Sequence, residues 1–377
     1  MTKKIALVTT GHPPFDERIY WKFGLSISAN GYKTAIFCST ENINRQEDNI
    51  SIIGFNDDSL KRKAKLNKLF ILIDEFKPDL IICFEASAII PAYKYKKSSN
   101  NKCIIVSDIT EWYPENVAFK KKGVNIYLTY IVLFAANFLL VNRCDFITIG
   151  EKLKFRRYKL LAPFIPKDII GYYPILKLFK YSMPQKGRTA FTLCYAGLIN
   201  FERGVLTIVE AADKFAKLHK EIDIKLKIFG KFQFTKEENK FNLFIKEKKD
   251  ITIERIGWTS YDRISDNLSD VHLCLDLRKR NFIYNNSLPI KIFEYMACGK
   301  PFIYSEIKPI KRELNFNDFG ILVNPDNLDE IIEAIEKYHS DYELLIKHSQ
   351  NSRKEIERFK NWETESKKLI NIIRNLI

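Results

Sequence analysis

FTLCYAGLINFERGVLTIVEAADKFAKLHKEIDIKLKIFG, residues 191–230, holds two short apolar runs with a longer patterned segment between them. The runs 191–197 and 222–230 have the length and apolar content of strands, while 205–219 carries apolar residues at helical spacing. A strand, a helix and a second strand in this order predict two parallel strands joined by a crossover helix.

The same alternation extends over the rest of the chain. Further runs that read as strands are KIALVTT (4–10), YKTAIFCST (32–40), DLIICFE (79–85), KCIIVSD (102–108), ITIERIG (251–257), VHLCLDL (271–277) and PFIYS (301–305). Segments of helical length separate them, so the sequence predicts an α/β fold of two doubly wound, Rossmann-like domains facing a cleft. Ligands of such sheets bind at the carboxyl ends of the strands, which is where functional residues are expected.

Positive charge is concentrated in the first half of the chain. The formal net charge is +15, of which residues 1–186 contribute +12, with 29 Lys and Arg against 17 Asp and Glu. A domain with this bias is expected to meet an anionic partner: a phospholipid surface, a phosphorylated substrate or nucleic acid. Nucleic acid is not expected, because no RRM, KH or helix-turn-helix signature is present.

One apolar segment stands apart from the strand and helix pattern. Residues 124–141 contain only Asn125, Thr129 and Asn137 as polar residues, and Lys120, Lys121 and Lys122 precede them. The segment is shorter than the ~20 residues of a spanning helix. We expect a buried core helix, with a helix in the membrane interface as the second interpretation and a span as the third.

The seven cysteines show no C-x-x-C spacing, and the opening residues lack the apolar core and cleavage site of a signal peptide. Buried, reduced thiols and a cytoplasmic location are therefore expected.

Candidate chemistry lies in NSLPIKIFEYMACGKP (286–301), which has the pattern of a loop that feeds a helix. Ser287 is predicted to cap the helix and Gly299 to end it. A helix start directs free N–H groups and a positive dipole at an anion, and Lys291 adds a full charge there. Glu294 shares the face of Lys291 and is placed to accept hydrogen bonds from sugar hydroxyls; the alternative is a simple intrahelical ion pair.

Other strand ends in the second half repeat this chemistry. Arg203 stands beside Gly204 after the strand 191–197, and Gly230 and Gly257 follow the next two strands. Two basic groups and strand-end glycines suit a nucleoside diphosphate. Neither G-x-x-x-x-G-K-[ST] nor G-x-G-x-x-G occurs, which argues against a P-loop or a dinucleotide site.

These segments also carry a resemblance. SLPIKIFEYMACGKPFIYSE (287–306), followed by FGILVNPDNLDEIIEAIEKY (319–338), resembles the carboxy-terminal domain of family-four (group 1) glycosyltransferases of the GT-B fold. TTGHPPFDERIYWKFGLSISANGYKTAIFC (9–38) and SDITEWYPE (107–115) are similar to bacterial surface-polysaccharide members of that family. Two positions depart from the family pattern: Asn286 stands where the first of two glutamates is usual, and Leu198 where a basic residue is frequent.

The resemblance implies retaining transfer of a sugar from a UDP- or GDP-linked donor, without a metal or other cofactor. The acceptor would be a saccharide linked to a lipid diphosphate, in capsule, O-antigen or exopolysaccharide synthesis. The protein would be peripheral on the inner, anionic face of the cytoplasmic membrane. It implies an acceptor-binding, membrane-facing domain over 1–185, a nucleotide-sugar domain over 186–355 and a C-terminal helix over 356–377, containing FKNWE (359–363), that returns to the first domain.

The same resemblance assigns roles to individual residues. Catalytic roles fall to Arg203, Lys291 and Glu294. Donor binding falls to Gly11, Gly197, Gly230, Gly257, Asn286, Ser287, Leu288 and Ile290. Acceptor binding falls to His12, Arg18, Asp108 and Glu111, with Arg18 either touching a phosphate or bracing Asp16. The alternatives are a nucleotide-sugar epimerase of the same fold and a non-catalytic partner protein, the latter because Asn286 carries no charge.

Overall fold

The computed structural model describes residues 2–98, 102–186 and 190–377, and the chain divides into two units. The first unit comprises Met1–Tyr172 and Trp362–Ile377, and the second comprises Tyr173–Asn361. The division after Tyr172 falls earlier than the 185/186 boundary expected from the sequence, because residues 173–185 pack with the second unit.

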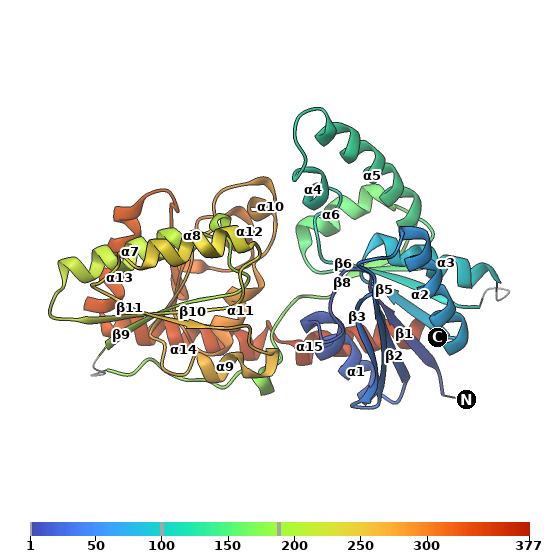
Figure 1. Cartoon of the computed structure of the whole chain (residues 1–377). Helices are drawn as coiled ribbons and strands as arrows, with labels where there is room; N and C mark the ends of the chain where they lie inside the picture. Colours follow the sequence, from blue (N-terminus) through green and yellow to red (C-terminus); the bar gives the residue numbers. More distant parts are fainter. Residues whose placement is uncertain (1, 99–101, 187–189) are drawn as a thin grey trace. The chain divides into compact units, whose positions relative to one another are not determined.

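The first unit is built on an eight-stranded sheet in the order β3-β4-β2-β1-β5-β6-β7-β8 (Figure 1). All neighbouring strands are parallel except β3, which is antiparallel to β4. The strands are β1 (Lys4–Val8), β2 (Lys33–Cys38), β3 (Thr40–Glu47), β4 (Ile50–Asn56), β5 (Leu80–Cys83), β6 (Ile104–Ile109), β7 (Phe146–Ile149) and β8 (Lys167–Ile169).

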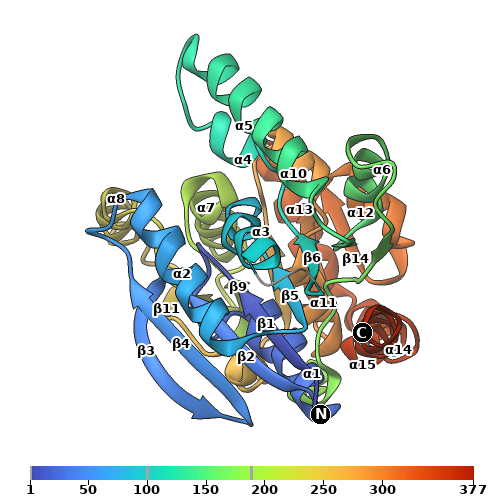
Figure 2. The same ribbon diagram turned by 90° about the vertical axis from the view of Figure 1, so that its right-hand side faces the viewer.

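Helices cover both faces of this sheet (Figure 2). They are a π-helical turn (Glu17–Gly24), α1 (Leu25–Ala29), α2 (Arg62–Phe76), α3 (Ile89–Ser98), α4 (Glu115–Ala118), α5 (Asn125–Val141), α6 (Lys152–Leu161) and α15 (Trp362–Leu376). The C-terminal helix α15 belongs to this unit, and Trp362 at its start stacks on Phe23 with ring centroids 5.7 Å apart. FKNWE is not wholly helical, because α14 ends at Arg358 and α15 begins at Trp362.

The second unit has a six-stranded, all-parallel sheet in the order β11-β10-β9-β12-β13-β14. Its strands are β9 (Ala190–Ala196), β10 (Asp223–Phe229), β11 (Thr252–Ile256), β12 (Leu273–Asp276), β13 (Phe302–Ser305) and β14 (Gly320–Val323). Its helices are α7 (Val205–Leu218), α8 (Thr235–Ile245), α9 (Ile264–Asn267), α10 (Phe282–Asn286), α11 (Ile290–Ala297), α12 (Lys308–Glu313), α13 (Leu328–Ser340) and α14 (Tyr342–Arg358).

Periodicity in the sequence explains how these helices pack. α7 buries the apolar stripe that includes Ile208, Ala212 and Phe215 against the sheet, and α13 packs beside it. α11 and α14 pack on the other face (Figure 1). The predicted fold class, two doubly wound α/β sheets, is confirmed.

The prediction of a buried core helix over 124–141 is wrong. α5 forms there, but it buries only Asn137, Leu140 and Val141. It packs on α4 and α3, and half of its apolar side chains are exposed. Among the described residues, no helix is both long and apolar enough to cross a membrane. All seven cysteines are buried and unpaired, as predicted.

Candidate functional site

Two basic side chains meet at the carboxyl end of β9. Asn200 accepts a hydrogen bond from the Arg203 backbone N–H (2.9 Å) and so holds the turn that precedes α7. A Cβ atom placed on Gly197 would lie 3.7 Å from Arg203 Nη1 and 4.0 Å from Lys291 Cε. Arg203 and Lys291, distant in sequence, therefore converge beside Gly197.

Gly230 packs against the backbone of Gly197 rather than approaching a ligand. Its φ is +131°, and a Cβ atom there would lie 1.8 Å from the carbonyl oxygen of Gly197. Only glycine lets the loops after β9 and β10 pack backbone against backbone at this distance. Gly257, by contrast, borders open space, with no heavy atom of the described neighbours within 4 Å of its Cβ position.

The helix α11 begins at Ile290, as the sequence pattern predicted, but its N-cap is not the predicted Ser287. Pro289 is its N-cap residue and supplies no side-chain cap, while Ser287 instead ends the short helix α10. Asn286 donates from Nδ2 to the carbonyl oxygen of Phe282 (2.7 Å) within α10. Asn286, Ser287, Leu288 and Ile290 are all half-buried, so the segment reaches the surface at the start of α11.

Lys291 and Glu294 form an ion pair on the first turns of α11. Lys291 Nζ lies 2.6 Å from Glu294 Oε2, and the side chain of Lys291 is 22% exposed while that of Glu294 is buried. The other carboxylate oxygen, Glu294 Oε1, is also buried and has no hydrogen-bond partner within the described chain. Arg203 Nε is likewise a buried donor without a partner there. A buried polar atom left unpaired costs roughly 1–3 kcal/mol, so this region has hydrogen-bonding capacity to offer a ligand.

Two tyrosines that the sequence analysis did not single out hold the end of β9. Tyr195 OH donates to the carbonyl oxygen of Leu198 (2.7 Å), and the backbone N–H of Ala196 donates to Tyr295 OH (3.0 Å). Burial, followed by the negative charge of Asp276, raises the pKa of Tyr195, so its hydroxyl stays protonated. Both rings are buried. The signal in the sequence is that each tyrosine interrupts an otherwise apolar run.

Trp258 is a third residue that the sequence analysis missed. It directly follows Gly257 after β11, is 65% exposed, and has Lys231 Nζ 5.2 Å from its ring centroid. Lys231 follows Gly230 after β10, so both side chains lie along the same carboxyl edge of the sheet. An exposed indole at a strand end is a flat surface on which a base can stack.

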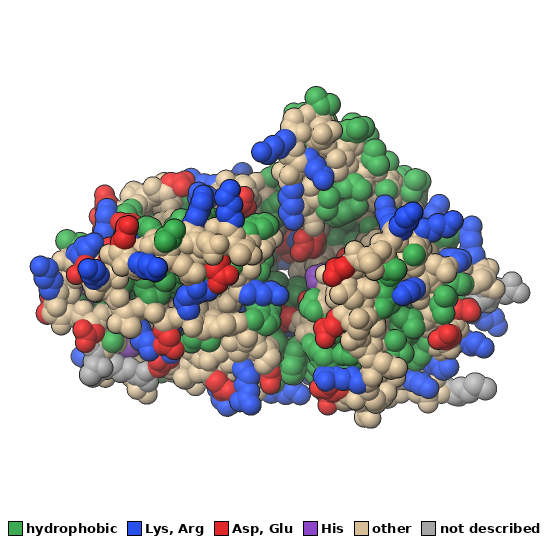
Figure 3. Space-filling view, viewed as in Figure 1, with side chains coloured by type: hydrophobic (Ala, Val, Ile, Leu, Met, Phe, Trp, Pro, Cys, Tyr) green, Lys and Arg blue, Asp and Glu red, His purple; other side chains and the backbone are tan. Residues whose placement is uncertain are grey.

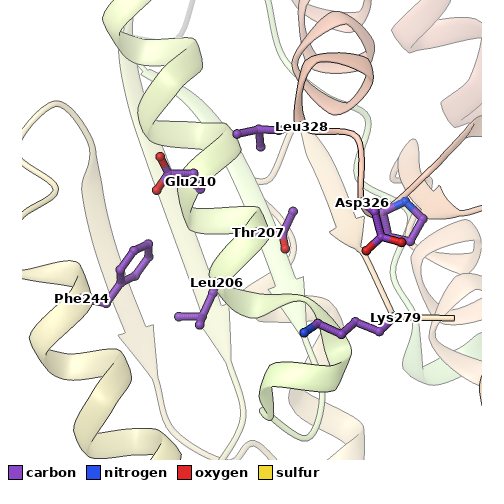
Figure 4. Close-up of a pocket in the computed structure, with 8 residues that line it drawn as sticks. Leu206, Thr207, Glu210, Phe244, Lys279, Asp326 and Leu328 are labelled. Carbon is purple, nitrogen blue, oxygen red and sulfur yellow. The ribbon is translucent and has the colours of Figure 1, made fainter. Parts of the chain in front are cut away.

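A pocket of about 460 Å³ lies on the outer side of α7. Leu206, Thr207 and Glu210 of α7 line it, with Phe244 of α8 on one side and Asp326 on the other (Figure 4). None of the residues predicted from the sequence lines this pocket, so it is distinct from the place where Arg203 and Lys291 meet.

In the first unit, Glu85 organises the loop after β1. Its carboxylate accepts hydrogen bonds from Thr9 Oγ1 (2.6 Å), from the backbone N–H of Thr10 (2.8 Å) and from that of Gly11 (3.2 Å). Gly11 thus lies at a braced strand end. Glu85 is the last residue of DLIICFE (79–85), so its place at a strand end was visible in the sequence, whereas the pairing of that strand with β1 was not.

His12 lies between two carboxylates of this loop. Its Nδ1 is 3.2 Å from Asp16 Oδ2 and its Nε2 is 3.5 Å from Glu85 Oε1. Burial alone would lower the pKa of His12, but the hydrogen bond to Asp16 and the charges of Asp16, Glu85 and Glu111 outweigh it and raise the pKa to about 9. His12 is therefore a cation at neutral pH. Glu111 is exposed and accepts a hydrogen bond from Asn116 Nδ2 (2.9 Å).

Arg18 and Asp108 are placed differently from the acceptor-binding role expected of them. They form a two-bond ion pair (2.6 and 2.8 Å) in which both side chains are buried. Arg18 also donates to the carbonyl oxygen of Ile170 (3.0 Å), and Thr148 Oγ1 donates to Asp108 (2.6 Å). Asp16 is braced by backbone N–H groups, among them that of Arg18, and not by the Arg18 guanidinium. The pair therefore links the helical segment that begins at Glu17, the strand β6 and the backbone after β8, all within the first unit.

In the parts of the chain that the structure describes, no three His, Cys, Asp or Glu side chains are grouped so that they could hold a metal ion.

Comparisons with known proteins agree with this geometry. Residues 183–355 match the family described as "Glycosyl transferases group 1". Sucrose-phosphate synthase from Thermosynechococcus elongatus is similar in structure (TM-score 0.77, 15% identity, 99% of each chain covered). So is Anabaena HepE in complex with UDP-glucose (TM-score 0.74, 12% identity, 99% of each chain). The lipopolysaccharide outer core galactosyltransferase WaaB is also similar (TM-score 0.61, 17% identity, 99% of this chain and 100% of that chain).

No curated protein sequence matches the chain. The structural likenesses, all at low identity, establish the GT-B fold. Residues 183–355 are a group 1 glycosyltransferase domain, and the protein is a glycosyltransferase.

Proposed function

We propose that the protein transfers a sugar, with retention of configuration, from a nucleotide-sugar to a saccharide acceptor carried on a lipid diphosphate, in bacterial surface-polysaccharide synthesis. The observation that carries the proposal is that Arg203 and Lys291 converge beside Gly197, while Arg203 and Glu294, the ion-pair partner of Lys291, each have a buried polar atom without a hydrogen-bond partner in the described chain. Arg203 Nε is a donor that a diphosphate oxygen fits, and Glu294 Oε1 is an acceptor that a ribose hydroxyl fits.

In the proposed reaction the bond between the anomeric carbon and the diphosphate oxygen breaks, and its electron pair leaves with the nucleotide. The acceptor hydroxyl bonds to the anomeric carbon on the same face, and its proton passes to the leaving phosphate oxygen. Arg203, Lys291 and the N–H groups at the start of α11 stabilise the charge that grows on the diphosphate. These side chains supply the charge, so the proposal requires neither a metal nor another cofactor.

A uridine nucleotide is the favoured donor over GDP. HepE is described in complexes with UDP and with UDP-glucose, which supports a UDP-sugar by likeness. Trp258, exposed at the same sheet edge, is proposed to stack on the base, with Lys231 beside it. Asn286, in place of the usual glutamate, would offer the sugar hydrogen bonds without charge.

The acceptor assignment rests on charge and on likeness. The first unit carries most of the excess of Lys and Arg, and His12 adds a cation in the loop after β1. WaaB is described as a lipopolysaccharide galactosyltransferase, which favours a surface-glycolipid acceptor. The proposed location is peripheral, on the inner face of the cytoplasmic membrane.

The decisive experiment is calorimetry with UDP, GDP and uridine, followed by analysis of the products formed from the UDP-sugar that binds. We expect UDP to bind more tightly than GDP, and slow donor hydrolysis with retention when no acceptor is present. An epimerised sugar nucleotide as the product would establish the epimerase alternative. Binding without any turnover, even with bacterial glycolipid extracts, would establish the non-catalytic partner.

A further inference from the structure

α5 exposes a continuous row of apolar side chains on one face, and the residues that it buries are Asn137, Leu140 and Val141. Asn137, which is buried, donates from Nδ2 to Tyr158 OH (3.2 Å) on α6. Within α5, Tyr130 stacks on Phe134. The outward side chains are 44–81% exposed, and they define what we call the α5 surface: Val124, Tyr127, Leu128, Ile131, Val132, Phe138 and Leu139. The outer face of a helix that packs on a soluble core is normally charged or polar, whereas the outer face of α5 is apolar.

Cations lie at the amino-terminal end of the same helix. Lys120, Lys121 and Lys122 are all exposed in the loop between α4 and α5. Figure 3 shows hydrophobic side chains gathered over the projecting part of the first unit that Figure 1 labels α5, with Lys and Arg side chains at its flank. Leu160 on α6 (83% exposed) and Phe164 just after it (92% exposed) add apolar area on the neighbouring element.

We infer that the α5 surface inserts into the interface of an anionic lipid bilayer, with Lys120–Lys122 on the headgroups, and that this contact holds the enzyme on the membrane. The inference rests on the membrane location in the proposed function and names the element responsible for it. α5 has 17 residues, or about 25 Å at 1.5 Å per residue, against a hydrocarbon core of about 30 Å. The helix is therefore suited to lie in the plane of the interface.

Charge favours a membrane over a second copy of the chain as the occupant. An isologous contact through the α5 surface would bring the lysine clusters of both copies to one interface, where they repel. Anionic headgroups attract the same lysines, and apolar side chains beside them enter the acyl boundary.

The test is co-sedimentation with vesicles of phosphatidylcholine alone and of phosphatidylcholine with phosphatidylglycerol. We expect binding to the anionic vesicles that weakens with salt. Replacing Leu128 and Ile131 with Asp should weaken it at least tenfold. The matched control, Leu218→Asp with Leu243→Asp, changes two leucines of the second unit that are 68% and 64% exposed, and should leave binding unchanged.

A second pair of variants isolates the charge contribution. Changing Lys120, Lys121 and Lys122 to Gln should weaken binding about 100-fold, because each cation near an anionic surface contributes roughly fivefold. The control replaces the exposed Lys240, Lys246 and Lys249 of the second unit with Gln. If both triple variants lose binding equally, the attraction is a general effect of net charge and the inference fails.

Insertion itself is measured with an environment-sensitive label. All seven native cysteines are buried, so a Leu128→Cys variant can be labelled selectively. Its fluorescence should brighten and shift to the blue on anionic vesicles, whereas a label at Leu243→Cys should not respond. An unresponsive Leu128 label on bound protein would overturn insertion.

UDP calorimetry on the same preparations separates this inference from the proposed function. Variants that bind UDP normally but not vesicles support the inference. If wild-type protein binds UDP but neither kind of vesicle, the membrane inference is overturned and the donor proposal is unaffected. Protein that binds anionic vesicles through α5 but no nucleotide overturns the proposed function alone. A concentration-dependent dimer that the Leu128 and Ile131 changes dissociate, without vesicle binding, would assign the α5 surface to self-association and overturn the inference.

Discussion

Lys291 Nζ lies 2.6 Å from Glu294 Oε2, and the carboxylate that it pairs with is buried. The pair therefore has two functions that can be separated: it neutralises a buried charge in α11, and it holds an ammonium group beside Arg203 and Gly197. Because Glu294 is buried, substitutions here also affect stability, which the sequence alone did not indicate.

We expect Lys291→Ala to lower sugar transfer by about 100-fold or more, since a preorganised charge at the leaving group is lost. It should also lower the melting temperature, because Glu294 is left as a buried, unpaired carboxylate. Adding Glu294→Gln should restore the melting temperature but not activity. Turnover assays and thermal denaturation measure the two effects, with the exposed Lys236→Ala as the control. Near-normal turnover in Lys291→Ala would remove Lys291 from the donor site.

Arg203→Ala should weaken UDP binding by about 10- to 150-fold, as expected for a charge-assisted hydrogen bond of ~1.5–3 kcal/mol. Uridine, which lacks phosphate, should bind as it does to the wild type. Titration calorimetry with both ligands is the measurement. A similar loss for uridine would give Arg203 a structural role in the turn before α7.

Trp258→Ala should weaken UDP and uridine to the same extent, by about 5- to 150-fold, because stacking on a base contributes ~1–3 kcal/mol. Trp258→Phe should restore part of the affinity. Phe359→Ala, which removes another aromatic side chain of the second unit with similar exposure (63%), serves as the control. Unchanged affinity for uridine would show that the base lies elsewhere.

His12 should titrate near pH 9, which imidazole NMR signals can follow. Its pKa is raised on folding, so its stabilising contribution is full below about pH 6.5 and is lost as the pH rises through about 9. The stability advantage of the wild type over His12→Gln should therefore be constant at acidic pH and shrink between pH 6.5 and 9 in urea unfolding. An advantage that grows over this interval would contradict the arrangement with Asp16 and Glu85.

The sequence by itself determined the order of strands and helices, because runs of buried strands and a 3.6-residue apolar period are local properties of the chain. It also placed Arg203 after a strand and Lys291 in the first turn of a helix, and parallel topology brings strand ends and the helix starts that follow them to one edge. The 286–301 block was specific enough to indicate the family.

Only the tertiary structure decided which polar side chains are buried against one another and which converge at a strand end. Arg18 and Asp108 resemble site residues in sequence, yet they are buried against each other, since an ion pair between residues far apart in the chain has no local signature. α5 has the composition of a core helix, and it is exposed because no other described element packs over its outer face. Burial depends on what the rest of the chain brings alongside a segment, and the segment's own residues do not encode it.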